Sequence, residues 1–357
     1  MLFVRTEDLK TGMRLARPVY NKKSILLFER NSLLSVQAIE SIRNFGLIGV
    51  YVLEPAEPLP PMTQEDLEFE RFQIKAVGAI EEEQERIRKT RKQSRTQAIA
   101  DMVIRNYGHL DEKINFYQNL RSLEDYVSRH SLNVAILCAM ITHVMNLRRE
   151  EQYHTVCAAI LHDMGKLEKK DAVYYGAPYS REDMLKNCET QEEAYGMIEE
   201  AFATEGMHIR RICQQAARKQ LDLFPADGEK SRYKMLAGAG VLLVANRYDE
   251  ITAMTLQGTA QSEVKAIQEF IEHPEVYDPE TVRALIRSIN ILPPGACVEL
   301  STGEKALVLN ENEENVLRPT LVSFRDNSIL NLSLPENEDI HIVDIMKTMD
   351  NRYIFSK

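Results

Sequence analysis

The stretch Cys157–Lys166 has the sequence CAAILHDMGK, in which an apolar run ends in the adjacent residues His162 and Asp163. The uninterrupted apolar run predicts a buried helix that ends at this His-Asp dyad. An imidazole and a carboxylate side by side can bind the same metal ion. We expect Gly165 to allow a sharp turn of the backbone and Lys166 to reach over the site toward a phosphate. The stretch therefore predicts a helical fold built around a metal centre.

The composition is that of an ordinary water-soluble protein, since 44% of the 357 residues are hydrophobic and 27% are charged. The longest apolar runs, such as Val134–Met140, are far shorter than the ~20 residues that cross a bilayer, so we expect no membrane span. A net charge of −10 argues against bulk binding to nucleic acid. Five widely spaced cysteines and the lack of a recognisable secretory signal predict a cytoplasmic protein.

Changes in sequence pattern divide the chain into five parts and predict a mainly α protein. A long centre with apolar residues at three- and four-residue spacing indicates a helical bundle. A small α+β module precedes it and a small, mostly antiparallel β module follows it. The expected bounds are 1–55 for the N-terminal module, 56–62 for a proline-rich linker, 63–120 for a charged helical segment, 121–290 for the bundle and 291–357 for the C-terminal module.

The two end modules contain short runs typical of strands. In the N-terminal module a helix is expected at Ser35–Asn44. The expected strands are Arg14–Tyr20, Ile25–Phe28, Gly49–Leu53, Cys297–Leu300, Lys305–Leu309, Thr320–Arg325, Ile329–Leu332 and Ile340–Val343.

Three further residues of the helical centre are candidates for the metal centre. His130 lies at the start of a strongly apolar expected helix. Asn246 and Asp249 are three residues apart, so they share one face of a later helix. A helical bundle can bring such residues to one point in its core. We therefore expect these side chains to lie close to the dyad.

Together, His130, the His162–Asp163 dyad and the segment Val244–Asp249 resemble the HD superfamily of metal-dependent phosphohydrolases. The Gly165-Lys166 extension and the long helical context resemble its HD-GYP branch, whose members hydrolyse cyclic dinucleotides such as cyclic di-GMP. Both end modules are similar to modules that often flank HD-GYP domains. The resemblance implies an HD-type bundle at the centre of the chain.

The resemblance also implies roles for single residues. In the family, a His, the dyad and a later Asp bind metal. This assigns metal binding to His130, His162 and Asp163, and it aligns Asn246 with the late Asp as a weak fourth ligand. Asp249 matches a supporting acid. Asp163 and the phosphate-reaching Lys166 are the expected catalytic residues.

Other family positions carry side chains that bind metal poorly. A His-Pro pair of the family aligns near Gln191-Glu192, its His-His pair falls within Gln214–Ala217, where Gln215 and Ala216 stand, and the Gly-Tyr-Pro signature is absent. His208 could replace a missing imidazole or simply lie on a helix surface. The segment Tyr174–Pro178 could cover the site or form an ordinary turn. We therefore expect one weakly bound divalent metal (iron, manganese or zinc) or none.

These observations favour a degenerate HD-GYP-like signalling protein, inactive or weak as a phosphodiesterase, that binds a nucleotide or acts as a scaffold in bacterial cyclic-dinucleotide signalling. Two alternatives stay open. One is an active cyclic di-GMP phosphodiesterase with a reduced site of His130, His162, Asp163 and Asn246. The other is a structural adaptor that acts through its end modules. Expected partners are a cyclic dinucleotide or other nucleotide, a signalling protein, and a second copy in a homodimer.

Overall fold

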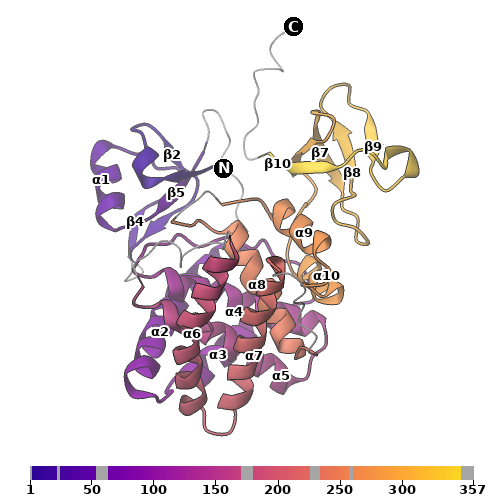
Figure 1. The fold of residues 1–357 in the computed structure, drawn as a ribbon. Coiled ribbons are helices and arrows are strands. Elements are labelled where there is room, and N and C mark those ends of the chain that lie inside the picture. Colours follow the sequence, from indigo (N-terminus) through magenta and orange to yellow (C-terminus); the bar gives the residue numbers. More distant parts are fainter. Residues whose placement is uncertain are drawn as a thin grey trace.

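The computed structural model describes residues 2–21, 25–53, 63–169, 180–225, 234–256 and 260–346. The chain is mainly α-helical, and the expected fold class is confirmed. The N-terminal and C-terminal modules lie beside the same end of the helical bundle (Figure 1). The expected linker at 56–62 and the segment Tyr174–Pro178 lie outside the described residues. The bounds of the five expected parts stay predictions.

The N-terminal module has a three-stranded antiparallel sheet with the order β1-β5-β2, formed by Leu2–Arg5, Gly49–Leu53 and Arg14–Leu15. The hairpin β3 (Val19–Tyr20) and β4 (Leu26–Phe28) and the helix α1 (Val36–Asn44) complete it. The Ser35 side chain caps α1 by accepting a hydrogen bond from the backbone of Ala38. The strand β1 was not expected from the sequence.

Four helices form the first half of the bundle. They are α2 (Gln64–Thr90), α3 (Thr96–Tyr107), α4 (Tyr126–Val144) and α5 (Arg149–Leu161). The helix α4 is buried along nearly its whole length, and α5, α8, α2 and α10 pack around it. Polar residues of α4 therefore lie inside the bundle, where they need partners. This central helix carries His130.

Five helices form the second half. They are α6 (Arg181–Ala201), α7 (Gly206–Gln220), α8 (Ala237–Thr252), α9 (Glu263–Glu272) and α10 (Pro279–Ser288). The helices α6 and α7 pack against each other, and α7 also contacts α5 and α8. Together they enclose the end of α5, where the dyad begins.

The C-terminal module is a five-stranded antiparallel sheet with the order β10-β6-β7-β8-β9. The expected strands are confirmed here with small changes of their ends. The strands are β6 (Cys297–Leu300), β7 (Lys305–Asn310), β8 (Thr320–Ser323), β9 (Ile329–Asn331) and β10 (Ile342–Ile345). The strand β10 packs against α9.

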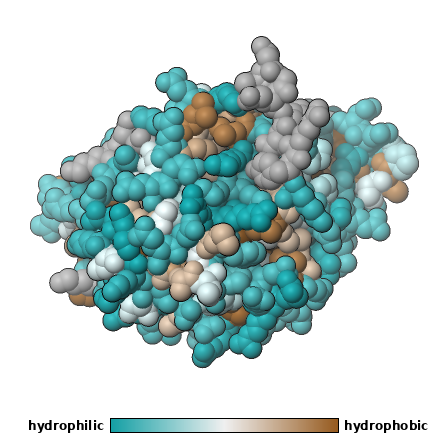
Figure 2. Space-filling model, turned by 60° about the horizontal axis from the view of Figure 1, so that its bottom comes forward, coloured by the Kyte–Doolittle hydropathy of each residue, from teal (hydrophilic) through white to brown (hydrophobic). Residues whose placement is uncertain are grey.

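The surface agrees with the charged composition. One face of the molecule is mostly hydrophilic, with apolar side chains in small groups (Figure 2). Among the described residues, every helix is too short or too polar to cross a bilayer.

Candidate metal centre

Three elements of the bundle bring the expected site residues together. The helix α5 ends at Leu161, so His162 and Asp163 stand at its carboxyl end, followed by the 3-10 turn Met164–Lys166. His130 comes from the second turn of α4, and Asn246 and Asp249 come from α8. All five side chains belong to residues that are at most 9% exposed. The expectation that they lie close together is confirmed.

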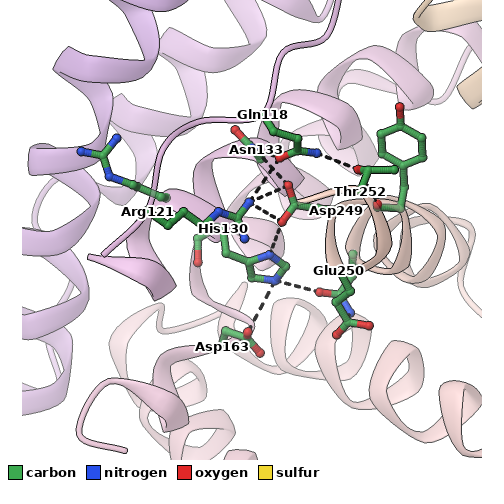
Figure 3. Close-up of polar contacts among 12 residues, drawn as sticks. Gln118, Arg121, His130, Asn133, Asp163, Asp249, Glu250 and Thr252 are labelled. Carbon is green, nitrogen blue, oxygen red and sulfur yellow. Dashed lines mark hydrogen bonds and ion pairs between the residues drawn. The ribbon is translucent and has the colours of Figure 1, made fainter. Parts of the chain in front are cut away.

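The polar atoms of these residues converge on one point. The Nε2 atoms of His130 and His162 are 3.1 Å apart. Asn246 Oδ1 lies 2.9 Å from the first and 3.0 Å from the second. The Asp163 carboxylate follows, with Oδ2 3.5 Å from His130 Nε2 and Oδ1 3.7 Å from His162 Nε2. Figure 3 shows His130 between Asp249 on one side and Asp163 on the other.

The outer hydrogen bonds of both imidazoles fix their protons away from this point. His130 Nδ1 donates to Asp249 Oδ2 at 2.6 Å, and His162 Nδ1 donates to the carbonyl oxygen of Ala159 at 2.8 Å. Each Nε2 of a neutral ring therefore presents a lone pair. Asn246 donates through Nδ2 to Glu250 Oε1 at 3.0 Å, so its Oδ1 also faces inward.

Three lone pairs without a proton between them repel one another unless a cation lies among them. Burial lowers the pKa of His162, so protonation of this ring is a poor way to provide that cation. Two imidazole nitrogens, a carboxylate and an amide oxygen suit a divalent transition metal. The donor set of His130, His162, Asp163 and Asn246 therefore fits one metal ion.

Asp163 has close partners on both carboxylate oxygens. Lys166 Nζ lies 2.7 Å from Oδ2, and Gln191 Nε2 donates to Oδ1 at 3.1 Å. Burial would raise the pKa of Asp163, but Lys166, His162 and His130 outweigh burial and hold this pKa well below its usual range. Asp163 is therefore a carboxylate at neutral pH, as a metal ligand must be.

Asp249 supports His130 from the other side. Its carboxylate accepts hydrogen bonds from Asn133 Nδ2 at 2.9 Å and from one guanidinium nitrogen of Arg121 at 2.8 and 2.6 Å. Burial alone would raise the pKa of Asp249, but Arg121 and His130 have the larger effect and hold this pKa well below its usual range. Asp249 therefore stays charged at neutral pH. A carboxylate that accepts the outer N–H of a ligating histidine fixes the ring and its tautomer. The geometry supports the expected role of Asp249.

A small cavity opens beside the dyad. Its volume is about 40 Å³, which holds a few water-sized groups. Its wall includes His162, Asp163 and Lys166, together with side chains of α6, α7 and α8. Of the positions expected to have lost their histidines, Gln191 and Ala216 line this cavity.

One sequence expectation needs correction, and the structure decides two further points. Gln215 does not line the cavity; its Oε1 accepts a hydrogen bond from the backbone of Leu236, because a neighbouring residue on a helix faces another side. His208 packs against His154, with ring centroids 4.9 Å apart, and does not replace a missing imidazole. Gly165 lies in the 3-10 turn that follows the dyad and has no positive φ; a side chain there would collide with the backbone carbonyl of Thr190 on α6.

Two residues of the site were not expected from the sequence. Glu250 lines the cavity and holds the amide of Asn246, and Arg121 neutralises Asp249. Glu250 directly follows Asp249 on α8, so helix periodicity alone would place it on a different face. Arg121 lies in the irregular segment before α4, where no periodicity indicates which residues are buried.

A family model matches the part of the chain that holds this site. Residues 127–249 match the model of the HD domain. A cyclic di-GMP phosphodiesterase of Pseudomonas aeruginosa is 22% identical over 217 residues, which cover 57% of this chain and 49% of the relative. The chain thus matches about half the length of this curated relative. Among solved structures, an HDGYP protein of Bdellovibrio bacteriovorus has a TM-score of 0.39 and 14% identity, covering 80% of this chain and 97% of that one.

Within the described part of the chain, one group of three or more His, Cys, Asp or Glu residues has ligand atoms that all lie within 4.8 Å of one another. It consists of His130, His162 and Asp163. All three lie in the matched range, as do Asn246 and Asp249. The part of the chain that matches the HD domain, residues 127–249, therefore contains a His/Asp group that could hold a metal ion.

Proposed function

We propose that this protein is an HD-GYP-like signalling component whose site binds one divalent metal and no longer supports efficient two-metal hydrolysis. The observation that carries this proposal is the contrast between the two sides of Asp163. On the inner side, imidazole and amide lone pairs face one point. On the outer side, Lys166 and the Gln191 amide occupy the carboxylate oxygens.

The charges around the cavity support a single cation. Asp163 is paired with Lys166, and Asp249 is paired with Arg121. Glu250 shares Arg247 with Glu269, and Arg247 lies closer to Glu269, at 2.7 Å, than to Glu250, at 3.4 Å. These pairs leave one negative charge in excess. Buried charges without a counter-charge are costly, so a bound cation would be stabilising.

A second metal would find few ligands. Two-metal hydrolysis needs anionic or imidazole ligands around both ions. The cavity wall beyond Asp163 carries Gln191, Ala216 and Ala217, together with the cationic Lys166. It also carries Cys188 and Cys213, whose thiol pKa values are raised by burial, which disfavours the thiolate that binds metal. Among the residues that the structure describes, Glu250 is the remaining carboxylate of the wall, and it is already bonded to Asn246 and Gln220. We infer that the described residues offer too few anionic or imidazole ligands for a second ion at the outer position.

The relative from Pseudomonas aeruginosa acts on cyclic di-GMP, so a cyclic dinucleotide is the first ligand to consider here. Pockets for ligands of drug-like size measure roughly 300–1,000 Å³. The cavity of about 40 Å³ admits at most one phosphate group of such a ligand. We therefore propose nucleotide binding at the mouth of the site, with Lys166 as the contact for a phosphate.

A second candidate function is a phosphohydrolase with one metal. The position of Lys166 beside Asp163 favours it, because an ammonium there can stabilise a developing negative charge. A bound metal would supply an activated water and polarise a phosphoryl oxygen. In this case His130, His162, Asp163 and Asn246 hold the ion, and Lys166 binds the phosphate.

Elemental analysis combined with nucleotide assays separates these functions. We expect one iron, manganese or zinc per chain in the wild type and none in His162→Ala. We further expect cyclic di-GMP to bind to the metal-loaded protein without turnover, as followed by chromatography of the reaction mixture. Two metals per chain with efficient turnover would contradict the proposal. Turnover with one metal per chain, lost in His162→Ala, would establish the one-metal enzyme instead.

A failure of both metal and nucleotide to bind would refute both functions and leave the structural adaptor. The control is His273→Ala, which replaces an exposed histidine outside the site. It should leave metal content and nucleotide binding unchanged.

A further inference from the structure

Arg121 is the largest of the fully buried side chains, with no exposed surface. It lies in the irregular segment that joins α3 to α4. A buried guanidinium is costly unless its charge is compensated, so a position of this kind depends on specific partners. The partners of Arg121 lie on the side of the metal centre that the cavity does not reach.

The guanidinium of Arg121 fixes one carboxylate. One terminal nitrogen contacts both oxygens of Asp249, at 2.8 and 2.6 Å, and Nε donates to Asn119 Oδ1 at 3.1 Å. Asp249 in turn accepts the Nδ1 proton of His130. Figure 3 shows Arg121 and His130 meeting at Asp249. Arg121 thereby acts on the Nε2 lone pair of His130 through a single intermediate side chain.

The backbone of the same segment is held by the N-terminal module. The Ile48 amide donates to the carbonyl oxygen of Arg121 at 2.9 Å, and Leu47 forms an antiparallel bridge with Ser122. Arg17 of the module donates to the carbonyl oxygen of Gln118 at 3.1 Å. These contacts hold the segment before α4 on both sides of Asn119.

Packing joins the module to the same place. Ile48 forms a buried cluster with Tyr126, and Phe3 and Tyr51 of the module pack against this cluster. The Tyr126 ring has the Arg121 guanidinium 4.9 Å from its centroid and stacks on His130, with centroids 6.5 Å apart. The contact between the N-terminal module and the bundle therefore lies next to the residues that orient His130.

We propose that Arg121 is a positioning residue of the metal centre and that the N-terminal module holds it in place. By holding the segment that carries Arg121, the module keeps the Asp249 carboxylate oriented, so that His130 presents Nε2 to the metal. A change in the contact between the module and this segment would then change metal affinity, which gives the module a means of regulating the site. This inference rests on the proposed one-metal site.

Lysine cannot replace arginine in this role, although it keeps the charge. A lysine ammonium is a single point of contact, whereas the guanidinium reaches Asp249 and Asn119 from two different nitrogens. Arg121→Lys is therefore the informative variant. The matched control is Arg129→Lys, which alters a buried arginine of α4 whose side chain pairs with Asp125 and not with Asp249.

The test measures binding of Mn²⁺ to the metal-free full-length protein by calorimetry. We expect Arg121→Lys to weaken binding by about 10–100-fold, the usual loss when an outer partner of a metal ligand is altered. Arg129→Lys should stay within about threefold of the wild type, because the Arg129 side chain bonds to Asp125 and not to Asp249 or a metal ligand. Equal effects of both variants would overturn the proposal.

A second readout needs no metal. With selectively ¹⁵N-labelled histidine, NMR should show His130 of the wild type as the Nδ1–H tautomer, and Arg121→Lys should shift its ring toward a mixture. If the wild type binds no Mn²⁺, the proposed one-metal function fails, while the tautomer still tests Arg121. An unchanged tautomer in folded Arg121→Lys would overturn the positioning role.

The contribution of the module is tested with Arg17→Lys. Lysine at this position can keep the ion pair with Glu70 but loses the additional bond to Gln118. We expect weaker Mn²⁺ binding than in Arg129→Lys, and we expect the double variant Arg17→Lys/Arg121→Lys to bind no more weakly than Arg121→Lys alone. Additive losses, or no loss in Arg17→Lys, would overturn the role of the module.

Discussion

The ammonium nitrogen of Lys166 lies 2.7 Å from Oδ2 of Asp163, and both side chains are less than 10% exposed. The two residues are three positions apart and are joined by the 3-10 turn that follows α5. Lys166 therefore neutralises the charge that would attract a metal ion. The same contact places a cation at the mouth of the cavity, where a phosphate would arrive.

Replacing Lys166 by methionine should strengthen metal binding. Repulsion between an ammonium and a divalent ion a few ångströms apart is on the order of several kcal/mol at an intermediate dielectric. We expect Lys166→Met to raise the affinity for Mn²⁺ by about tenfold or more, since about 1.4 kcal/mol corresponds to tenfold. Without metal the variant should unfold at a lower temperature, because Asp163 loses its partner.

Lys219→Met is the matched control, because Lys219 forms an ion pair with Asp222 at the same three-residue spacing outside the cavity. It should leave Mn²⁺ affinity unchanged in calorimetry. An affinity of Lys166→Met at or below that of the wild type would show that Lys166 does not compete with the metal.

Stability of the metal-free protein should fall as the pH is lowered through the histidine range. Burial lowers the pKa of His162, and burial with the neighbouring His154 lowers the pKa of His208. Below the ordinary value of 6.5 the unfolded chain then binds more protons than the folded chain, so acid favours unfolding. The depressed pKa values of Asp163 and Asp249 add a further loss below about pH 4.

Urea unfolding in the presence of a chelator, at about pH 7.5 and about pH 5.5, measures this loss on either side of the histidine pKa. His208→Gln should reduce the difference between the two pH values without removing it, since His162 still contributes. His273→Gln, at an exposed position, should not reduce it. A wild-type protein more stable at the lower pH would contradict the sign of this prediction.

Restoring imidazoles at the degenerate positions should raise the metal content. Gln191 and Ala216 both line the cavity, and Gln191 already touches Asp163. We expect the double variant Gln191→His/Ala216→His to bind more than one metal per chain, because imidazoles supply the ligands that a second ion lacks. Elemental analysis after manganese loading measures this content.

The control for this gain is Gln214→His/Ala216→His, because Gln214 bonds to Glu192 on the surface and does not line the cavity. It should keep the wild-type stoichiometry. If both double variants bind the same amount of metal, the loss of ligands at Gln191 does not explain the single site.

The sequence was sufficient for the helical centre and for the convergence of His130 with the dyad, because motif spacing and helix periodicity constrain both. It could not predict the partner of Asp249, since Arg121 belongs to an irregular segment whose burial depends on the docked N-terminal module. It also misplaced Gln215, because one residue along a helix changes the face by roughly 100°. Long-range packing decides such details, and local sequence patterns do not contain it.

Gly165 should be required for the approach of α6 to the dyad. A methyl group there would meet the backbone carbonyl of Thr190 and, at 2.7 Å, Oε1 of Gln191. The Gly165 amide also donates to this Oε1 at 2.9 Å, so α6 and the turn are in direct contact. Gly165→Ala must displace α6, since a backbone atom cannot rotate away, and overpacking of this kind costs about 1–3 kcal/mol. We expect a lower melting temperature together with weaker Mn²⁺ binding, because Gln191 moves relative to Asp163.

The matched control is Gly196→Ala on α6, where an added methyl meets nothing within 4 Å. Alanine should stabilise that helical position by up to about 1 kcal/mol. Calorimetric melting and Mn²⁺ titration of both variants distinguish close approach from a general sensitivity of α6, and equal melting temperatures for the two variants would refute the contact.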